Sequence, residues 1–419
     1  MLQTLDNNLI LRTIRDDADR ERFAALSTIY NNPSEGATCA CLLHHHPEAT
    51  TDDYWLVEDP ATGEVVSTTC LIPWTCHFAG LDLRVAQLEM VLTRPDYRGR
   101  GLVRLQMDNF QKAVKERGYD LSIIWGIPYY YRQYGYAYAV DGDVRESLPA
   151  WKIPSASAGS AIPLNLRKAQ IADIPRLVAA YGEITAPLDF YTRRTPTYWR
   201  FLIEAAQHPV QIVENPQTGE ILGYVTLQRG PESVTILESG LNHAEAALSL
   251  LQMLKFEGMP QILIAWPAST PLAQLARSLG SQTVPGGQWL LRFPDVAQFF
   301  TKIGSVLESR LAASAWRGIT RELTINLFRW AYRLRFAGGK LAGVDSLGFV
   351  DSSMGADGGD LQIPPDAFVR LASGFRGLGD LFDAWPDILV KPAARPLVDA
   401  LFPQMPGYLY TPYHFLGLE

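Results

Sequence analysis

The feature that most restricts the fold is the stretch from Leu88 to Val103, which predicts a buried β-strand, a tight turn and a helix. Residues 85–93 are mostly apolar and partly β-branched, as is typical of a buried strand. Apolar side chains then recur at close to helical spacing from Leu102 to Val114. The helix is predicted to end at residues 115–118, where cations occupy the last turn and a glycine follows.

The turn at residues 98–101 has the character of a phosphate site. Its two glycines leave the backbone open to close approach by a ligand. The unpaired N–H groups of the following helix lie at the positive end of its dipole, which favours an anion. Arg98, Arg100 and Arg104 add positive charge. The alternative is an ordinary strand–turn–helix with a solvated basic surface, and the short motif alone leaves both interpretations open.

The composition predicts a folded protein with several domains. A length of 419 residues suggests two to four domains of about 100–200 residues each. A hydrophobic content of 47% is enough to build buried cores. The net charge of -7 argues against a dedicated nucleic-acid binder and mildly favours the approach of cationic amines.

We expect a soluble cytoplasmic protein. No uncharged apolar run approaches the ~18–20 residues that a membrane span requires. Residues 1–6 lack the basic start and the apolar core of a secretory signal.

The four cysteines are expected to be reduced, as is usual in a cytoplasmic protein; they are Cys39, Cys41, Cys70 and Cys76. Cys39 and Cys41 precede His44-His45-His46, which invites a metal interpretation. The alternative is two small buried residues beside a polar loop. No second cysteine or histidine pair lies at zinc-finger spacing, so no metal is predicted.

Two segments, in order, resemble the GCN5-related N-acetyltransferases, the GNAT family. Residues 98–103 (Arg98-Gly99-Arg100-Gly101-Leu102-Val103) resemble its acetyl-CoA loop, Arg/Gln-x-x-Gly-x-Gly/Ala, with Val103 departing at the last position. Residues 121–126 are predicted to form the next strand, and residues 127–136 resemble the family's Tyr-x-x-aromatic-Gly-aromatic segment. Both motifs in order, with one helix and one strand between them, are more specific than either alone.

The resemblance implies a binding site for acetyl-CoA. The strand end at residues 91–93 would splay from its neighbour and bind the pantetheine arm, with an N–H near Val91 facing the thioester carbonyl. The N–H groups of residues 99–104 would hold the pyrophosphate, and residues 126–127 would border the pantetheine side. The cofactor-binding residues implied in this way are Val91, Leu92, Thr93, Arg98, Gly99, Arg100, Gly101, Leu102, Val103, Arg104, Gly126 and Ile127.

The resemblance also implies a proton donor. Acyl transfer needs a neutral amine and a proton for the departing thiolate, and a free thiol has a pKa of about 8.5. Tyr131 aligns with the tyrosine of the family motif and is predicted to be the general acid. The competing tyrosines, whose alternative role is packing, are Tyr129, Tyr130, Tyr134 and Tyr136.

The first domain is predicted to be the catalytic GNAT domain, residues 1–150. Strands are expected near residues 9–14, 54–58, 65–72 and 82–93. A helix is expected from Asp16 to Tyr30, and a polar loop or short helix over residues 31–53. By resemblance, this polar segment borders the acceptor site.

A second domain is predicted over residues 151–294, after linker-like composition at residues 151–160. A strand at residues 164–167 and a helix start near Asp173 resemble the opening of the first domain. Strands and a helix follow between residues 210 and 265. The counterpart of the glycine loop, residues 239–244, has no arginine-glycine run. We therefore predict a divergent, non-catalytic GNAT-like domain that does not bind acetyl-CoA.

A third domain is predicted over residues 295–419. A long helix is expected over residues 296–314, followed by strands at 321–328, 330–336 and 340–347 and by two or three helices. Residues 360–374 and 401–403 resemble parts of a sterol-carrier-like domain. The predicted fold class of the chain is α+β (mixed α/β). A GNAT domain, a divergent GNAT-like domain and a sterol-carrier-like domain, in that order, resemble the enhanced-intracellular-survival (Eis-like) proteins. By resemblance, the chain would be a homo-oligomer, with a hexamer as the suggested form.

The general base is left open by the sequence. In enhanced-intracellular-survival proteins the C-terminal carboxylate, usually of a terminal phenylalanine, reaches back into the acetyltransferase site. Phe415 resembles that end, but four residues follow it, so either the carboxylate of Glu419 still reaches the site or the tail takes another route. Glu89 within the strand is an alternative, as is a water chain.

The sequence therefore predicts an N-acetyltransferase that moves an acetyl group from acetyl-CoA to a primary amine by direct attack in a ternary complex. An aminoglycoside, a polyamine, a small amine or a lysine side chain would serve as the acceptor. The alternative is a non-catalytic carrier of apolar ligands with a vestigial acetyltransferase domain. The intact motif at residues 98–103 and Tyr131 argue against it.

Overall fold

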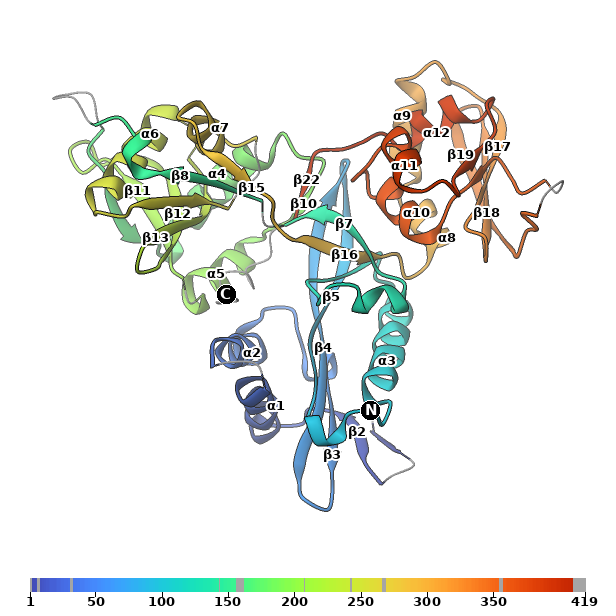
Figure 1. Cartoon of the computed structure of the whole chain (residues 1–419), viewed down its shortest axis with the longest axis horizontal. Coiled ribbons are helices and arrows are strands. Elements are labelled where there is room, and N and C mark those ends of the chain that lie inside the picture. The colour runs from blue at the N-terminus through green and yellow to red at the C-terminus, as the bar shows by residue number, and fades with distance from the viewer. Residues whose placement is uncertain are drawn as a thin grey trace.

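The computed structural model of the protein describes residues 2–5, 8–30, 33–142, 144–155, 162–206, 208–241, 243–265, 269–353 and 357–409. Within these residues the chain forms three β-sheets, and Figure 1 shows that they belong to a long stem and two upper lobes. The stem contains most of the first sheet, and the second and third sheets form the two lobes.

The first sheet carries the predicted strand–turn–helix unit near its centre. In spatial order its strands are β1 (Leu2–Thr4), β2 (Ile10–Thr13), β3 (Tyr54–Asp59), β4 (Glu64–Phe78), β5 (Leu81–Thr93), β6 (Leu121–Ile124), β16 (Gln288–Arg292) and β7 (Ala137–Asp141). Beside this path, β10 (Phe190–Thr192) pairs with β4, and β22 (Gly407–Tyr408) pairs with β10. The four strands predicted in the first domain are confirmed as β2 to β5.

Helices cover both faces of this sheet. Figure 1 shows α1 (Asp17–Tyr30) and α2 (Pro33–His45) on one face and α3 (Leu102–Glu116) on the other. The apolar stripe of α3 is buried against the sheet, where Phe110 packs edge-to-face on Trp55 with ring centroids 6.3 Å apart. Short 3-10 helices lie at Thr51–Asp53, Pro95–Tyr97, Tyr130–Tyr134, Ala150–Lys152 and Ile171–Asp173.

The helix α2 is longer than the sequence suggested. We expected a polar loop or a short helix over residues 31–53, but α2 has 13 residues. Cys39, Leu42 and Leu43 give it a buried face in the same core as Phe23 of α1, and this packing stabilises a segment whose overall composition is polar.

The second sheet repeats the order of the first. Its strands are β15 (Gln282–Val284), β8 (Arg145–Pro149), β14 (Gln261–Ile264), β13 (Ser233–Ser239), β12 (Ile221–Arg229), β11 (Val210–Glu214) and β9 (Asn165–Lys168). Its helices are α4 (Ile174–Thr185), α5 (Pro196–Ala205), α6 (Ala244–Phe256) and α7 (Pro271–Ser278). As in the first sheet, most neighbouring strands are antiparallel, but β13 and β14 are parallel, like β5 and β6.

Two strands are exchanged between these sheets. β8 precedes residue 150 but pairs with β14 and β15 in the second sheet. β16 precedes residue 294 but lies between β6 and β7 in the first sheet. Both exchanges cross the predicted boundary between residues 150 and 151, so the first two lobes share their backbone pairing. The domain boundaries given by the sequence remain predictions.

The third sheet consists of β19 (Lys340–Gly348), β18 (Ala331–Ala337), β17 (Arg321–Asn326), β20 (Leu361–Gln362) and β21 (Leu389–Val390). Its helices are α8 (Val296–Lys302), α9 (Gly304–Ala312), α10 (Pro365–Ala372), α11 (Leu378–Ala384) and α12 (Arg395–Leu401). The single helix predicted over residues 296–314 is wrong, because the chain turns at Ile303 and divides it into α8 and α9. Gly304 allows this turn to pack closely against Leu341, because a Cβ atom added at Gly304 would lie only 3.1 Å from Leu341 Cδ2.

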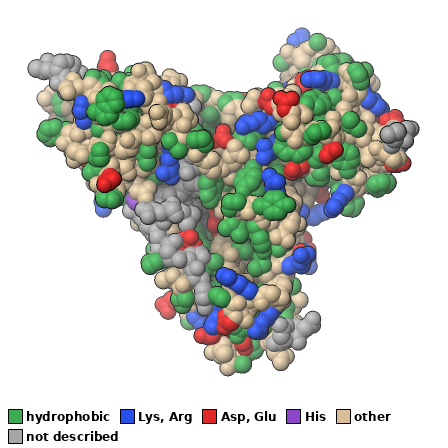
Figure 2. Space-filling view, viewed as in Figure 1, with side chains coloured by type: hydrophobic (Ala, Val, Ile, Leu, Met, Phe, Trp, Pro, Cys, Tyr) green, Lys and Arg blue, Asp and Glu red, His purple; other side chains and the backbone are tan. Residues whose placement is uncertain are grey.

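Within the part of the chain that the structure describes, no helix is long and apolar enough to cross a membrane. We call the stem the first lobe, and the lobes that contain the second and third sheets the second and third lobes. The surface in Figure 2 mixes apolar and charged side chains over all three.

Candidate active site

The strand β5 separates from β6 halfway along its length. Their parallel pairing covers only Val85–Gln87 and Leu121–Ile123, although β5 continues to Thr93. On its other side, the register with β4 shifts between Thr68 and Cys70, and Met90 has a φ of 53°. This is a β-bulge, which bends the strand and removes backbone groups from the ladder. The family resemblance implied the splay but not the bulge, because methionine gives no sign of a left-handed backbone conformation.

Side chains of β4 and α3 hold the end of β5 in place. Ser67 Oγ lies 2.6 Å from the carbonyl oxygen of Leu92 and 2.7 Å from Thr93 Oγ1, and it accepts a hydrogen bond from Gln106 Nε2 at 2.5 Å. Thr68 Oγ1 donates to the carbonyl oxygen of Met90 at 2.9 Å. The open edge of the splayed strand is therefore the edge that faces away from β4.

The loop that follows β5 depends on two glycines. Gly99 and Gly101 have φ angles of 77° and 76°, in the left-handed region where other residues are strained. Gly101 directly precedes α3, whose first N–H groups have no partner within the helix. Arg100 does not face the cavity, because its guanidinium lies over the Tyr97 ring at 4.4 Å and donates to the carbonyl oxygen of Asp96.

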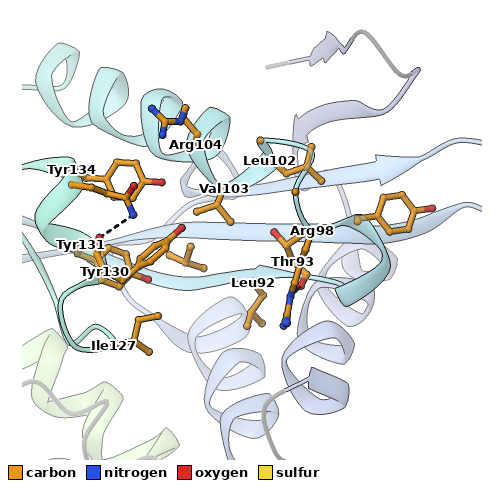
Figure 3. A pocket seen from close by; sticks show the side chains of 15 residues that line it. Leu92, Thr93, Arg98, Leu102, Val103, Arg104, Ile127, Tyr130, Tyr131 and Tyr134 are labelled. Atoms are coloured by element: carbon orange, nitrogen blue, oxygen red, sulfur yellow. Dashed lines mark hydrogen bonds between the residues drawn. The ribbon is translucent and has the colours of Figure 1, made fainter.

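A cavity of about 630 Å³ lies between the end of β5, the glycine loop, the start of α3 and the tyrosine segment. We name it the donor cavity after the acetyl-CoA residues predicted there. Figure 3 shows Tyr130, Tyr131 and Tyr134 on one side of it and Leu92, Thr93 and Arg98 on the other. The structure gathers ten of the predicted cofactor residues here; they are Val91, Leu92, Thr93, Arg98, Gly99, Gly101, Leu102, Val103, Arg104 and Ile127. Two are not among the lining residues, namely Arg100 and Gly126.

A second cavity, of about 220 Å³, lies on the opposite side of the splayed strand. We name it the acceptor cavity because the polar segment predicted to border the acceptor site lines it. It is lined by Glu35 and Thr38 of α2, by Glu89 and by Gly126, among others. The two cavities share four lining residues, which are Val91, Leu92, Ile127 and Tyr131. The gap between β5 and β6 thus has an opening on each side, and Tyr131 lies where the two openings meet.

Glu89 is partly buried, and part of its surface faces the acceptor cavity. Burial raises the pKa of its carboxyl group to about 7, and the nearby Glu35 raises this pKa further, whereas a hydrogen bond from Gln87 opposes the shift. Gln87 Nε2 donates to Glu89 Oε1 at 2.7 Å and is itself oriented by Trp74 Nε1, which donates to Gln87 Oε1 at 3.1 Å. The carboxylate is therefore fixed in position and titrates near neutral pH.

Tyr131 differs from the other tyrosines of its segment. It is buried, and burial raises the pKa of its hydroxyl far above the ordinary value, with Glu89 adding to the rise. Tyr136 is bound to Ser122 at 2.7 Å, and Tyr129 is 76% exposed. Tyr130 and Tyr134 line only the donor cavity. Tyr131 is thus the tyrosine that faces both cavities, and it is protonated at neutral pH.

Gly126 positions Tyr131 by leaving space for its ring. A Cβ atom added at Gly126 would lie 2.3 Å from Tyr131 Cδ2, too close for the ring to stay where it is. We predict that Gly126→Ala displaces Tyr131 and lowers kcat/KM for acetyl transfer by about tenfold or more. Gly182→Ala is the control, because nothing lies within 4 Å of that position in α4. Equal activity of the two variants would contradict this packing role.

The remaining candidates from the sequence are the cysteines and histidines considered as metal ligands and the C-terminal residues. Within the described residues, no three His, Cys, Asp or Glu side chains gather as metal ligands would. Cys39 is buried, which raises the pKa of its thiol to about 12, and Cys41 Sγ lies 3.3 Å from the carbonyl oxygen of Ala205. Glu419 and Phe415, proposed for the C-terminal end of the site, lie outside the described residues.

A comparison with family models finds one match in the stem. Residues 11–139 match the model described as an acetyltransferase (GNAT) domain. None of the curated protein sequences matches the chain.

Solved structures resemble the chain over nearly its whole length. One is a conserved protein from Enterococcus faecalis V583 described as a probable N-acyltransferase (14% identity, TM-score 0.67, covering 96% of this chain and 98% of that chain). Another is a GCN5-related N-acetyltransferase from Kribbella flavida (17% identity, TM-score 0.66, 96% and 99%). A third is Eis1 from Mycobacterium abscessus (18% identity, TM-score 0.61, 95% and 98%). At these identities the likeness shows a shared fold.

Proposed function

We propose that the protein is an acetyl-CoA-dependent N-acetyltransferase that acetylates a primary amine by direct attack in a ternary complex. The observation that carries this proposal is the meeting of a donor cavity and an acceptor cavity at Val91 and Tyr131. An amine in the acceptor cavity would reach the thioester through the gap between β5 and β6. No covalent enzyme intermediate is required when both substrates meet in this way.

The donor cavity suits acetyl-CoA. The phosphates of acetyl-CoA would bind the free N–H groups at the start of α3, and Arg98 and Arg104 would supply positive charge. The pantetheine arm would lie along residues 91–93, where β5 has lost its neighbour. The N–H of Val91 would face the thioester oxygen, on which negative charge develops during attack.

Glu89 is our proposed general base. Amines are mostly protonated at neutral pH and must lose a proton before they attack. A carboxylate with a pKa of about 7 is well matched to this task, and Glu89 faces the acceptor cavity. Glu35 lines the same cavity, so two carboxyl groups would favour a cationic amine there.

The chemical step then balances as follows. Glu89 takes the proton that the protonated amine loses before it attacks. The neutral amine nitrogen then bonds to the acetyl carbon, the carbon–sulfur bond breaks, and the second proton that nitrogen loses is taken up by the departing thiolate, which gives the amide and CoA thiol. The thiolate leaves beside Tyr131. Because the pKa of Tyr131 is raised far above the ~8.5 of a thiol, Tyr131 would stabilise the thiolate chiefly by donating a hydrogen bond.

We expect Tyr131→Phe to lower kcat by about tenfold to a hundredfold, because one hydrogen-bond donor to a good leaving group is lost. Binding of acetyl-CoA, measured by calorimetry, should stay within about threefold of wild type, since the ring remains in place. Tyr129→Phe is the matched control, because Tyr129 lines neither cavity. An unchanged kcat for Tyr131→Phe would remove this residue from the chemical step.

The function as a whole is tested by following CoA thiol release from acetyl-CoA with a thiol reagent, across aminoglycosides, polyamines, small amines and lysine peptides. We expect release that depends on the amine and an acetylated product of matching mass. Silence across the panel together with no acetyl-CoA binding by calorimetry would contradict the proposal and would favour the carrier alternative.

The second lobe is proposed to be non-catalytic. Glu238 follows the last parallel pair of β13 by two residues, as Glu89 does in β5. Unlike Glu89, Glu238 is buried against Arg194, whose guanidinium donates two hydrogen bonds of 2.6 Å to it. An internal ion pair thus occupies the space where the first lobe has a cavity-facing carboxylate. The sterol-carrier-like identity of the third lobe and the hexamer are carried forward as proposals from resemblance.

A further inference from the structure

A separate cavity of about 550 Å³ lies between the first and third lobes. We call it the inter-lobe cavity. Lys115 of α3, Gly135 and Arg292 of β16 line it from the first lobe, and Trp330, Tyr332 and Phe368 line it from the third. It shares no lining residue with the donor or acceptor cavity. Gly135 ends the 3-10 helix that contains Tyr131, so the inter-lobe cavity borders the C-terminal end of that helix.

The charge of this cavity is positive in a protein whose net charge is -7. Lys115 pairs with Asp295 at 3.5 Å, which balances those two charges. Arg292 and Arg329 form no ion pair with any described residue. Figure 2 shows Lys and Arg side chains, in blue, near the junction of the right-hand lobe with the stem.

Arg292 is the informative cation. Its side chain is partly buried, and burial lowers the pKa of the guanidinium, which nevertheless stays charged at neutral pH. Gly135 leaves room for it, since a Cβ atom added there would lie 3.4 Å from Arg292 Nε. A cation that has lost water and gained no counter-charge is unfavourable, and an anion bound in the cavity would offset that cost.

The remaining lining is apolar and aromatic. Phe293 and Phe368 are buried with ring centroids 6.0 Å apart, and Tyr332 packs against the same cluster. Trp330 at the rim is 61% exposed, although it is a large apolar side chain beside a concave surface. Pockets of several hundred Å³ with aromatic walls and a few charged groups are typical of small-molecule sites.

We propose that the inter-lobe cavity binds an organic anion with an apolar body. Arg292 holds the anionic group, Arg329 adds attraction at the mouth, and the aromatic side chains cover the apolar body. This site is independent of the proposed acetyltransferase function, because none of its residues lines the donor or acceptor cavity.

The test uses 8-anilinonaphthalene-1-sulfonate, a fluorescent anion with an apolar ring system, titrated into the full chain with saturating CoA to cover the donor cavity. We expect one saturable site per chain, displaced by dodecanoate but not by dodecylammonium. Arg292→Gln should weaken binding at least tenfold, Arg292→Lys should restore part of it, and Trp330→Ser should weaken it severalfold. Hydrogen exchange should show protection by the probe at residues 288–296 and 327–332.

Two control variants separate this site from general dye binding. Arg317→Gln removes an exposed arginine of the third lobe that does not line the cavity. Phe349→Ser removes an exposed aromatic side chain that does not line it either, although its neighbour Gly348 pairs with Ala331, next to Trp330. Both should bind the probe like wild type. The proposal is overturned if Arg292→Gln binds the probe as tightly as these controls do. A second outcome would also overturn it. If sedimentation shows that chains associate, and Trp330→Ser abolishes the association but leaves probe binding unchanged, this face is a contact between chains and the probe binds elsewhere.

Discussion

Replacing Glu89 with glutamine is expected to lower kcat/KM for amine acetylation by about a hundredfold to ten-thousandfold, the range usual for a lost general base. Glutamine keeps the size and can still hydrogen-bond Gln87, so the pocket should hold its shape. Acetyl-CoA binding by calorimetry should be nearly unchanged, because Glu89 does not line the donor cavity. Steady-state rates of thiol release measure the effect.

The pH dependence identifies the group. Burial raises the pKa of Glu89 to about 7, and the base must be unprotonated, so kcat/KM should rise with pH through about 7. The titration of the amine gives a further rise near the amine's own pKa. Two acceptors of different pKa separate these effects, because the limb near 7 belongs to the enzyme and should be the same for both. If Glu89→Gln kept both its rate and this limb, the base would have to be another group.

The part of the site that was predicted consists of residues that are close together in the sequence. Residues 91–93, 98–104 and 126–131 lie in three short segments whose strand, turn and helix patterns are local, and the structure places most of them around one cavity. Arg100 is the exception, because its preference for the Tyr97 ring depends on packing that no motif encodes. Its outward position could not be read from the Arg-Gly-Arg-Gly pattern.

The acceptor side was harder to predict because its residues come from distant segments. Glu35 and Thr38 enter through α2, whose polar composition suggested a loop or a short helix. Only the tertiary contact of Cys39, Leu42 and Leu43 with the core stabilises this helix and fixes which of its faces meets β5. A carboxylate pair formed by α2 and β5 leaves no spacing pattern in the sequence.

The exchanged strands show the same limit for the fold. β8 and β16 have five residues each, and nothing in so short a segment specifies which sheet it joins. The choice is made by hydrogen-bond partners more than a hundred residues away, such as Leu148 with Ile262 and Leu290 with Ile124. Most strands of the first lobe were therefore predictable, whereas β8 and β16 were not predicted, and neither was the division of strands between the lobes.

Replacing Arg194 with methionine is expected to lower the free energy of unfolding by about 3–5 kcal/mol, because it leaves the buried carboxylate of Glu238 without a counter-charge. Both side chains are 1% exposed. The guanidinium also lies 4.3 Å from the Tyr181 ring centroid and 4.9 Å from that of Trp199. Such a loss is a large fraction of the 5–15 kcal/mol typical of a folded domain. Denaturant unfolding followed by circular dichroism measures it.

Arg193→Met is the matched control, since this adjacent arginine is 46% exposed and pairs with Asp82, which is 51% exposed. It should cost less than about 1 kcal/mol, as surface ion pairs usually do. The double variant Arg194→Met with Glu238→Met should recover part of the loss, because no charge is then buried alone. Recovery should be incomplete, since the Tyr224 hydroxyl donates to Glu238 and would lose its acceptor. Equal losses for Arg193→Met and Arg194→Met would mean that the buried pair does not hold the second lobe together. Because Arg194 follows β10, which extends β4 of the first sheet, a real loss should also lower the temperature at which acetyl transfer is inactivated.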